Sequence, residues 1–414
     1  MRTTTCVVAG GGPAGMMLGL LLARAGVEVT VLEKHADFLR DFRGDTVHAS
    51  TLRLLDELGL GEQFRALPQS RLQNFELPQA DGSVVTLGDF SRLPPPYDHV
   101  AMVPQWDLLN LLADAGRAEP TFTLAMSTAA VDLVQDGERV TGVRTRTADG
   151  VEDELHADLV VACDGRGSVL RAAAGLVPHE HPVPFDTWWF RLPRFPREQQ
   201  QAAALVPRLA GNEIVLSFPR TDYFQVAYFN RKGLDATLRA EGVAAFRQRV
   251  LRLRPDWADR VDHLRSVDEL HVLDVRLNRL HRWHRPGLLL IGDAAHAMSP
   301  AGGVGINLAV QDAVAAAALL AGPLREHRLT TDDLAQVHRR RWWPTVVVQQ
   351  AQRVLHRLVF VPALAGRPPG AFRVVSRVMG RWPQLSRVPA QLIAFGPRPE
   401  HAPDFARRQP QPSR

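Results

Sequence analysis

Cysteine and lysine are nearly absent from this sequence. Its 414 residues include two cysteines, Cys6 and Cys163, and both lie in apolar runs that are typical of buried strands. Two cysteines so placed provide neither a disulfide framework nor a zinc site, so we expect a reducing, cytoplasmic compartment. The lysines are Lys34 and Lys232, and arginine supplies all the others of the 49 basic residues, as is typical of a GC-rich genome.

The chain also lacks clustered charge and a long apolar run. Its net charge of +5 is spread along the sequence, which disfavours nucleic-acid binding. We find no apolar stretch of the roughly 18 to 20 residues that a membrane span needs. Glycines interrupt the apolar N-terminus, where a signal peptide would need an unbroken core. With 45% apolar and 22% charged residues, the composition is typical of a globular enzyme with two or three subdomains.

The N-terminal stretch VVAGGGPAGMMLGLLLARAGVEVTVLEK, residues 7–34, predicts a strand, a tight turn, a helix and a second strand. Glycines between a strand and a helix are typical of a dinucleotide-binding turn, where the backbone approaches a pyrophosphate. Glu33 ends the second strand, where a carboxylate binds ribose hydroxyls and repels a 2′-phosphate. The stretch therefore predicts FAD or NAD as its ligand. The turn residues expected at that ligand are Gly10, Gly12, Ala14 and Gly15.

Two further strand–turn–helix signals follow. In LVVACDGRGSVLR, residues 159–171, a buried strand delivers Asp164 to a turn, although such a turn is equally common without a ligand. In LLLIGDAAHAMSPAGGVGINLAVQDA, residues 288–313, a strand ends at Gly292 and Asp293, where a carboxylate can bind a polyol hydroxyl. A glycine-rich loop then opens a helix, whose N–H groups suit negative charge on a reduced flavin ring. The loop and helix start contain Pro300, Gly302, Gly303, Gly305, Ile306 and Asn307.

Apolar periodicity and turn residues predict the elements between these motifs. We expect a helix over 50–66, a hairpin within 72–103, a helix over 106–118 and an antiparallel meander over 122–162. Prolines, tryptophans and short alternating runs after residue 176 indicate a separate sheet. A long Ala-rich helix is expected over about 306–320. In the arginine-rich tail from residue 330 we expect helices broken at Pro344, Pro362, Pro368 and Pro369.

The three motifs, in this order and at these separations, resemble the flavoprotein aromatic hydroxylases of the para-hydroxybenzoate hydroxylase type over residues 5–320. The resemblance implies an α/β fold. A Rossmann-like FAD-binding domain of three layers (ββα) would be interleaved with a substrate-binding domain built on a mixed β-sheet, and a C-terminal helical segment would follow. The expected parts are 1–75, 100–175 and 265–325 for FAD, 76–99 and 176–264 for substrate, and 326–414 for the helical region.

The resemblance also implies FAD as the dinucleotide and assigns its contacts. Gly10, Gly12, Gly15 and Glu33 would bind the ADP half, and Asp293 the ribityl or pyrophosphate portion. The other implied contacts are Arg43 near the pyrophosphate and the nicotinamide entry side, Gln105 on the ribityl side, Asp164 at a turn shared by FAD and NAD(P)H, and Pro300 to Asn307 along the flavin ring. Val304 departs from the family, where many relatives have glutamine, and this difference concerns the substrate class more than FAD.

The implied reaction is that of a single-component monooxygenase. NADH or NADPH reduces FAD, O2 adds at flavin C4a, and the hydroperoxide inserts one oxygen atom into an aromatic or polyketide-like small molecule. A second Gly-x-Gly-x-x-Gly after a strand, which a separate nicotinamide domain would need, is absent from the sequence. This absence agrees with the family.

Substrate contacts are expected on the separate sheet. Arg191, Tyr223 and Gln225 are the candidates, and a strand places Tyr223 and Gln225 on one face. Each is equally consistent with a surface or packing role, and Trp188 and Trp189 are expected in the core. We expect His179 and His181 in a loop without a metal, and we assign no general base and no oligomeric state.

Three different functions remain open. A flavin-dependent halogenase needs a Trp-x-Trp-x-Ile-Pro signature and a catalytic lysine upstream of it, but this chain has WWFRLP and, upstream, only Lys34 beside Glu33. The second is a flavin-dependent reductase of isoprenoid-type double bonds, and the third is a flavin-stabilised protein without turnover. Arg339, Arg340 and Arg341, with Trp342 and Trp343, are interpreted as a solvated face of a packed helix rather than a membrane or partner site.

Overall fold

The computed structural model describes residues 2–39, 46–78, 84–198, 204–205, 207–367 and 370–409. Its largest sheet has a parallel centre, with one antiparallel strand at the edge. Runs of Val, Leu and Ala build the central strands, because a parallel sheet is covered on both faces. In spatial order the strands are β20 (His284–Arg285), β21 (Leu288–Leu290), β11 (Glu152–Ala162), β1 (Arg2–Ala9), β2 (Val29–Leu32) and β8 (Phe122–Ala125).

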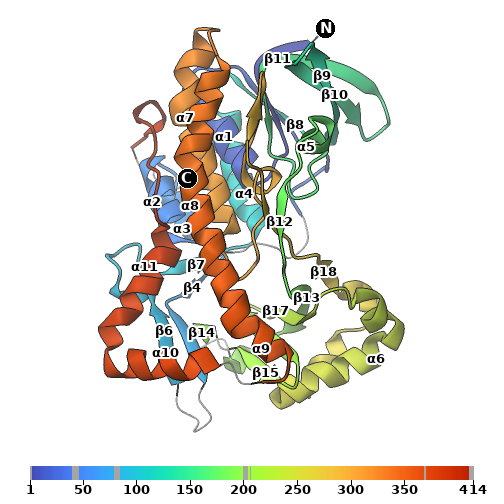
Figure 1. The fold of residues 1–414 in the computed structure, drawn as a ribbon, viewed down its shortest axis with the longest axis vertical. Coiled ribbons are helices and arrows are strands. Elements are labelled where there is room, and N and C mark those ends of the chain that lie inside the picture. Colours follow the sequence, from blue (N-terminus) through green and yellow to red (C-terminus); the bar gives the residue numbers. More distant parts are fainter. Residues whose placement is uncertain are drawn as a thin grey trace.

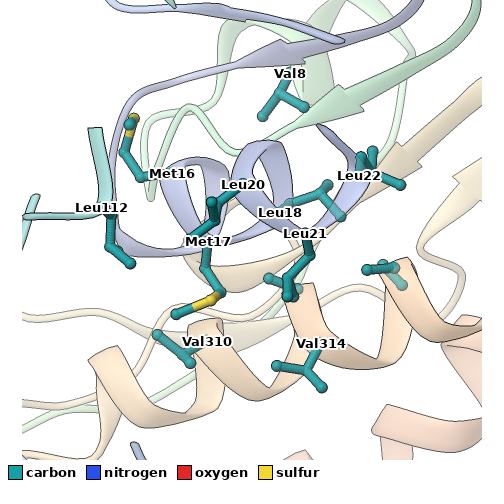
Figure 2. Close-up of a cluster of buried hydrophobic side chains, with 14 of the residues drawn as sticks. Val8, Met16, Met17, Leu18, Leu20, Leu21, Leu22, Leu112, Val310 and Val314 are labelled. Atoms are coloured by element: carbon teal, nitrogen blue, oxygen red, sulfur yellow. The ribbon is translucent and has the colours of Figure 1, made fainter. Parts of the chain in front are cut away.

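Alternate residues of β1 face two different layers. Cys6 and Val8 pack in the cluster formed with the helices α1 (Pro13–Arg24), α4 (Gln105–Arg117) and α7 (Gly305–Arg325). Figure 2 shows side chains of α1 meeting Val310 and Val314 of α7. Val7 and Ala9 pack on the opposite side, with β9 (Thr128–Asp136) and β10 (Arg139–Thr147), which continue antiparallel from β11. The predicted α/β fold of ββα layers is confirmed.

Two predictions about these elements were wrong in detail. The helix expected over 50–66 is two helices, α2 (Ala49–Glu57) and α3 (Gly61–Ala66). They are separated because Gly59 follows α2 with a φ of +74°, a conformation that ends a helix. The meander expected over 122–162 begins only at β9. Strand β8 instead pairs in parallel with β2, since α4 returns the chain to the sheet as a crossover.

The second large sheet is antiparallel. Its strands, in spatial order, are β15 (Arg208–Ala210), β16 (Glu213–Pro219), β17 (Tyr223–Arg231), β13 (Phe185–Pro193) and β18 (His271–Leu273). Trp188 packs toward α6 (Asp235–Leu253), whereas Trp189 belongs to a cluster on the other face that includes Ala301 of the third motif. Both tryptophans are buried, as predicted. We call the face that carries Trp189 the inner face, and it meets the glycine-rich loop.

Short strands connect the two sheets. The expected hairpin is β5 (Asn74–Pro78) with β6 (Val84–Asp89), and β14 (Ala204–Leu205) pairs with β5 in parallel. A second small sheet contains β3 (Thr46–Val47), β7 (Val100–Met102) and β4 (Ser70–Leu72). The segment with His179 and His181 is not a loop: it forms β12 (His179–His181), which pairs with β19 (Leu277–Arg279). The domain boundaries given above stay a prediction.

The C-terminal part is helical. It contains α8 (Thr331–Leu355), a π turn labelled η7 (His356–Phe360), α9 (Val361–Leu364), α10 (Gly370–Arg381) and α11 (Arg387–Phe395). Earlier in the chain, a short helix α5 (Val169–Ala173) begins within the second motif. Figure 1 shows α8 running along the molecule from the parallel-sheet part to the antiparallel sheet. The expected break at Pro344 does not occur: the proline is buried within α8, and packing there outweighs the missing N–H bond.

Among the described helices, α7 is long and apolar enough to cross a membrane by length and composition. About 78% of its most apolar window is buried inside the fold. The Ala-rich sequence of α7 is therefore accounted for by close packing against α1 in the core.

Candidate functional site

The first motif is a turn that requires glycine at two positions and leaves space at a third. Gly10 has a φ of +113°, and a Cβ there would lie 2.4 Å from the carbonyl oxygen of Cys163. A Cβ on Gly15 would lie 1.9 Å from the carbonyl oxygen of Gly10, so the third glycine lets α1 approach the strand. A Cβ on Gly12 would meet nothing within 4 Å. Gly12 precedes α1, whose N-terminal N–H groups face this open space.

Glu33 lies at the end of β2, next to this turn. Its side chain is 1% exposed, and its two carboxylate oxygens accept hydrogen bonds from the backbone N–H groups of Gly11 (3.0 Å) and His35 (2.9 Å). These bonds fix the carboxylate against the glycine turn. Ala14 is buried in the first turn of α1, which follows that turn. The arrangement suits recognition of ribose hydroxyls at the ADP half of a dinucleotide.

The second motif is joined to the third by an arginine that the sequence did not single out. Asp164 accepts a hydrogen bond from the N–H of Leu170 (3.1 Å), and its Oδ1 is buried without a hydrogen-bond partner among the described residues. Burial raises the pKa of Asp164. Two residues further on, Arg166 donates to Oδ2 of Asp293 (3.1 Å). The turn after β11 and the turn after β21 thus lie side by side, as parallel neighbours should.

Hydrogen bonds from the segment that begins at β3 fix the glycine-rich loop and the helix start of the third motif. The hydroxyl of Thr46 donates to the carbonyl oxygen of Gly303 (2.9 Å), and the hydroxyl of Thr51 donates to Oδ1 of Asn307 (2.6 Å). Asn307 is buried and its Nδ2 has no hydrogen-bond partner in the described ranges. Gly302 and Gly303 have φ values of +86° and +63°. The remaining loop residues, Pro300, Gly305 and Ile306, are half-buried.

A buried ion network around Asp312 of α7 also contacts the third motif. Asp312 accepts hydrogen bonds from the N–H of Gly292 (3.1 Å), from Nε of Arg341 (3.0 Å) and from the ring of His296 (2.5 Å). Burial opposes ionisation, but His296 and Arg341 together hold the pKa of Asp312 below its usual value. Arg341 also donates to Glu400 of the chain's last segment (3.3 Å).

This network corrects the interpretation of the arginine run. Arg339 is exposed as expected, but Arg341 is 1% exposed and lies in the ion network. Helical geometry explains the difference, since residues two apart on a helix face different directions. The sequence carried one signal that was missed: Asp312 at the end of the third motif needs a buried cation.

The predicted substrate residues lie together on the inner face, next to α4. The guanidinium of Arg191 lies 4.6 Å from the ring centre of Tyr223 and 5.8 Å from that of Trp106. Gln225 pairs with Arg191 across β13 and β17, and its Oε1 accepts a hydrogen bond from Nη2 of Arg220 (2.8 Å). Arg220 and Gln225 are both buried. The neighbour of Trp106 is Gln105, the first residue of α4, so these side chains lie beside a predicted flavin contact.

Two points complete the placement of the predicted residues. Arg43 lies outside the described residues, and its predicted contact stays a prediction. In the described part of the chain we find no group of three or more His, Cys, Asp or Glu side chains that could hold a metal ion.

The residues present fit FAD. The turn with space at Gly12, the acidic residue Glu33 and the unsatisfied Oδ1 of Asp164 lie at the carboxyl ends of neighbouring parallel strands. Ligands of open α/β sheets bind at that edge. The unsatisfied Nδ2 of Asn307 lies in the first turn of α7, after the glycine-rich loop. Here, Glu33 and the first turn would hold the ADP half, Asp293 the middle, and the loop from Gly302 the flavin.

Comparison with known proteins agrees with this fit. The family model described as FAD binding domain matches residues 2–351. The chain is 36% identical over 407 residues to 6-methylpretetramide 4-monooxygenase of Streptomyces rimosus, covering 95% of this chain and 93% of that protein. It is 29% identical over 318 residues to para-nitrophenol 4-monooxygenase of Pseudomonas sp. strain WBC-3, covering 74% of this chain and 75% of that protein.

A solved structure shows the same fold. The crystal structure of p-nitrophenol 4-monooxygenase from Pseudomonas putida DLL-E4 superposes with a TM-score of 0.79 at 22% identity, covering 96% of this chain and 100% of that one. The match to the family model over most of the length, together with the monooxygenase relatives, identifies the cofactor and the reaction type. The chain therefore belongs to the FAD-dependent aromatic hydroxylase family, and it is an FAD-dependent monooxygenase.

Proposed function

We propose that this monooxygenase uses NADH or NADPH and O2 to hydroxylate a large aromatic, polyketide-like molecule between the inner face and the glycine-rich loop. The observation that carries the proposal is the likeness over almost the whole length to a 6-methylpretetramide 4-monooxygenase. The aromatic inner face supports it, because the ring centres of Trp189 and Phe218 lie 5.8 Å apart there. Trp189 belongs to the cluster that contains Ala301, and Phe218 packs against that cluster. A flat, apolar substrate is suited to such a surface.

Each group has a proposed part. Bound FAD supplies the electron storage and the activation of O2, and the route through a flavin C4a-hydroperoxide belongs to this proposal. Arg191 and the Arg220–Gln225 pair orient the polar edge of the substrate from β13 and β17. Packing between the inner face and Ala301 excludes water from the reacting atoms. Neither described lysine suits a halogenase: Lys34 is exposed beside Glu33, and Nζ of Lys232 is bound by Asp186 (2.8 Å) and Asp274 (2.5 Å).

The test follows oxygen from O2 into product. The purified protein is mixed with FAD, NADH or NADPH, isotopically labelled O2 and a panel of polyketide-derived aromatics and simple phenols. We expect one labelled oxygen atom in a product of the polyketide-derived class and faster NAD(P)H oxidation in its presence. A product that gains two hydrogens and no label, or a halogenated product that needs chloride, would contradict the proposal. So would a preference for simple phenols over all larger substrates.

A further inference from the structure

The helix α8 and the π turn that continues it present three buried polar side chains to the segment just before the glycine-rich loop. Gln349, Gln352 and His356 are all almost completely buried. They are spaced by three and four residues, so they share one side of the helix. That side faces residues 297–301, which connect the strand end at Gly292 with the loop. Figure 1 shows α8 extending alongside both sheets.

Gln352 binds the main chain of this segment at three points. Its Oε1 accepts a hydrogen bond from the N–H of Ser299 (3.2 Å), and its Nε2 donates to the carbonyl oxygens of Ser299 (2.8 Å) and Ala301 (2.8 Å). Residues 297–301 belong to no helix or strand that would pair these groups. One neutral amide thus supplies the donor and acceptor partners that buried backbone requires.

His356 links the same segment to the substrate sheet. Its Nε2 lies 2.9 Å from Oγ of Ser299, and that oxygen also accepts a hydrogen bond from the N–H of Ala301 (3.3 Å). Its ring lies edge-on to Phe185 of β13, with ring centres 5.2 Å apart. Burial lowers the pKa of His356 to about 4, so the ring is neutral at neutral pH. The helix widens into a π turn at this residue, a feature that is frequent at functional sites.

We propose that Gln352 is a positioning residue for the flavin: it fixes the backbone at Ser299 and Ala301 and thereby the loop that begins at Gly302. His356 couples this fixed segment to the inner face through Phe185. Both residues lie just beyond the 2–351 range of the family match. The proposal concerns FAD binding alone and needs neither the proposed substrate nor turnover for its test.

The experiment compares variants of one helix by titrating apoprotein with FAD. Gln352→Met keeps the length of the side chain and removes its hydrogen bonds. We expect the dissociation constant of FAD to rise about tenfold or more, since three buried backbone groups lose a partner. The visible absorbance bands of bound flavin should shift. Gln350→Met is the matched control, because Gln350 is exposed on α8 and bonds only to Arg353 among described residues. Its affinity and spectrum should equal those of the wild type.

A second variant separates positioning from packing. In Gln352→Glu, the carboxyl group can donate to a carbonyl oxygen only when it is protonated. Lowering the pH from 8.5 to 5.5 should therefore tighten FAD binding relative to the wild type by about threefold or more. The proposal is overturned if Gln352→Met binds FAD within twofold of the wild type with an unchanged spectrum. It is equally overturned if the ratio of FAD dissociation constants at pH 8.5 and pH 5.5 is the same in Gln352→Glu as in the wild type. If Gln352→Met does not fold, this ratio alone decides.

Discussion

At the scale of single residues, the glycines of the first turn differ in what a Cβ atom would disturb, which is either the fold or the approach of a ligand. Gly12 has ordinary backbone angles (φ −76°, ψ −177°), and a Cβ there would meet no atom of the described residues within 4 Å, so nothing in the described part of the fold requires glycine at this position. Only a ligand that approaches the backbone closely would need it. Gly10 differs, since its positive φ and the nearby carbonyl of Cys163 require glycine for folding itself.

This contrast gives a prediction for Gly12→Ala. We expect the free energy of unfolding of the apoprotein to stay within about 0.5 kcal/mol of the wild-type value, since the new methyl group meets no atom of the described residues within 4 Å. FAD binding should weaken at least about tenfold, because the methyl group occupies the approach to the pyrophosphate. Urea denaturation and FAD titration measure the two effects. Gly322→Ala, also with open space but within α7, is the control and should leave FAD affinity unchanged. Equal FAD affinity in Gly12→Ala and wild type would show that the cofactor does not lie at this turn.

His48 gives a residue-scale prediction about pH. It is buried between the glycine-rich loop and α11. Its Nδ1 lies 2.8 Å from the carbonyl oxygen of Ile393, so Nδ1–H donates, and its Nε2 has no hydrogen-bond partner among the described residues. Burial lowers the pKa of His48 to about 4. The unfolded chain, with a pKa near 6.5, binds the proton first. Stability from this group is therefore complete above pH 6.5 and is lost as pH falls toward 4.

Protonation of His48 should lower the free energy of unfolding by about 3 kcal/mol at most. His48→Asn, whose amide can replace the Nδ1–H donor, should unfold with a smaller difference in free energy between pH 7 and pH 4.5 than the wild type. Urea denaturation at the two pH values measures this difference. His263→Asn serves as the control, since His263 is exposed. An unchanged pH dependence in His48→Asn would mean that His48 takes up no proton on unfolding.

At the scale of elements, α8 is the helix that binds the parallel-sheet part and the last segment of the chain together. Arg341 reaches from α8 to Asp312 of α7 and to Glu400, and both carboxylates are buried. Arg340, one residue earlier, also bonds to Glu400 (2.6 Å). Removing one partner of such a network leaves a buried charge uncompensated.

Arg341→Met should therefore lower the free energy of unfolding by about 3–5 kcal/mol. Asp312 would then lose a charged partner. Because Asp312 also bonds to the N–H of Gly292 in the third motif, we expect weaker FAD retention during gel filtration. Chemical denaturation and the flavin-to-protein absorbance ratio measure these effects. Arg339→Met, at an exposed position of the same helix, should change stability by no more than about 0.5 kcal/mol. Comparable losses in both variants would argue against a special role of the network.

At the scale of the whole molecule, three distant parts of the chain meet at one edge of the parallel sheet. The turns after β1, β11 and β21 meet because these strands are parallel neighbours in one sheet. A ligand that touches all three links the N-terminal, middle and late sequence in a single binding event. Its binding energy is added to the stability of the entire fold.

Removal of FAD should accordingly lower the midpoint of thermal unfolding, and its addition should restore it in a concentration-dependent way. At a hundredfold excess over the dissociation constant, the gain is about 2.7 kcal/mol. Differential scanning fluorimetry of stripped protein measures the shift. FMN lacks the adenosine half and so cannot engage Glu33, and we expect a smaller shift at equal concentration. Identical midpoints with FAD, FMN and no flavin would contradict convergence of the three turns on FAD.

Much of the molecule was predictable because local patterns and tertiary structure agree. The glycine turn at Gly10, the acid at Glu33 and the strand ends at Asp164 and Asp293 each follow from strand and helix periodicity with turn residues. Their proximity follows from a parallel sheet, in which strand ends meet at one edge. The substrate identity did not follow, since it depends on which side chains of the antiparallel sheet turn inward and what fills the space between them.

The sequence by itself determined the α/β class, the FAD family and the order of the cofactor motifs, since each motif lies within one short stretch of chain. Only the tertiary structure decided the partners of buried polar groups. The bond of Arg166 to Asp293, the pairing of Arg341 with Asp312 and the three bonds of Gln352 join residues 29 to 127 positions apart. No local pattern encodes such pairs, because burial, which makes an unpaired polar group costly, arises only when the whole chain has packed.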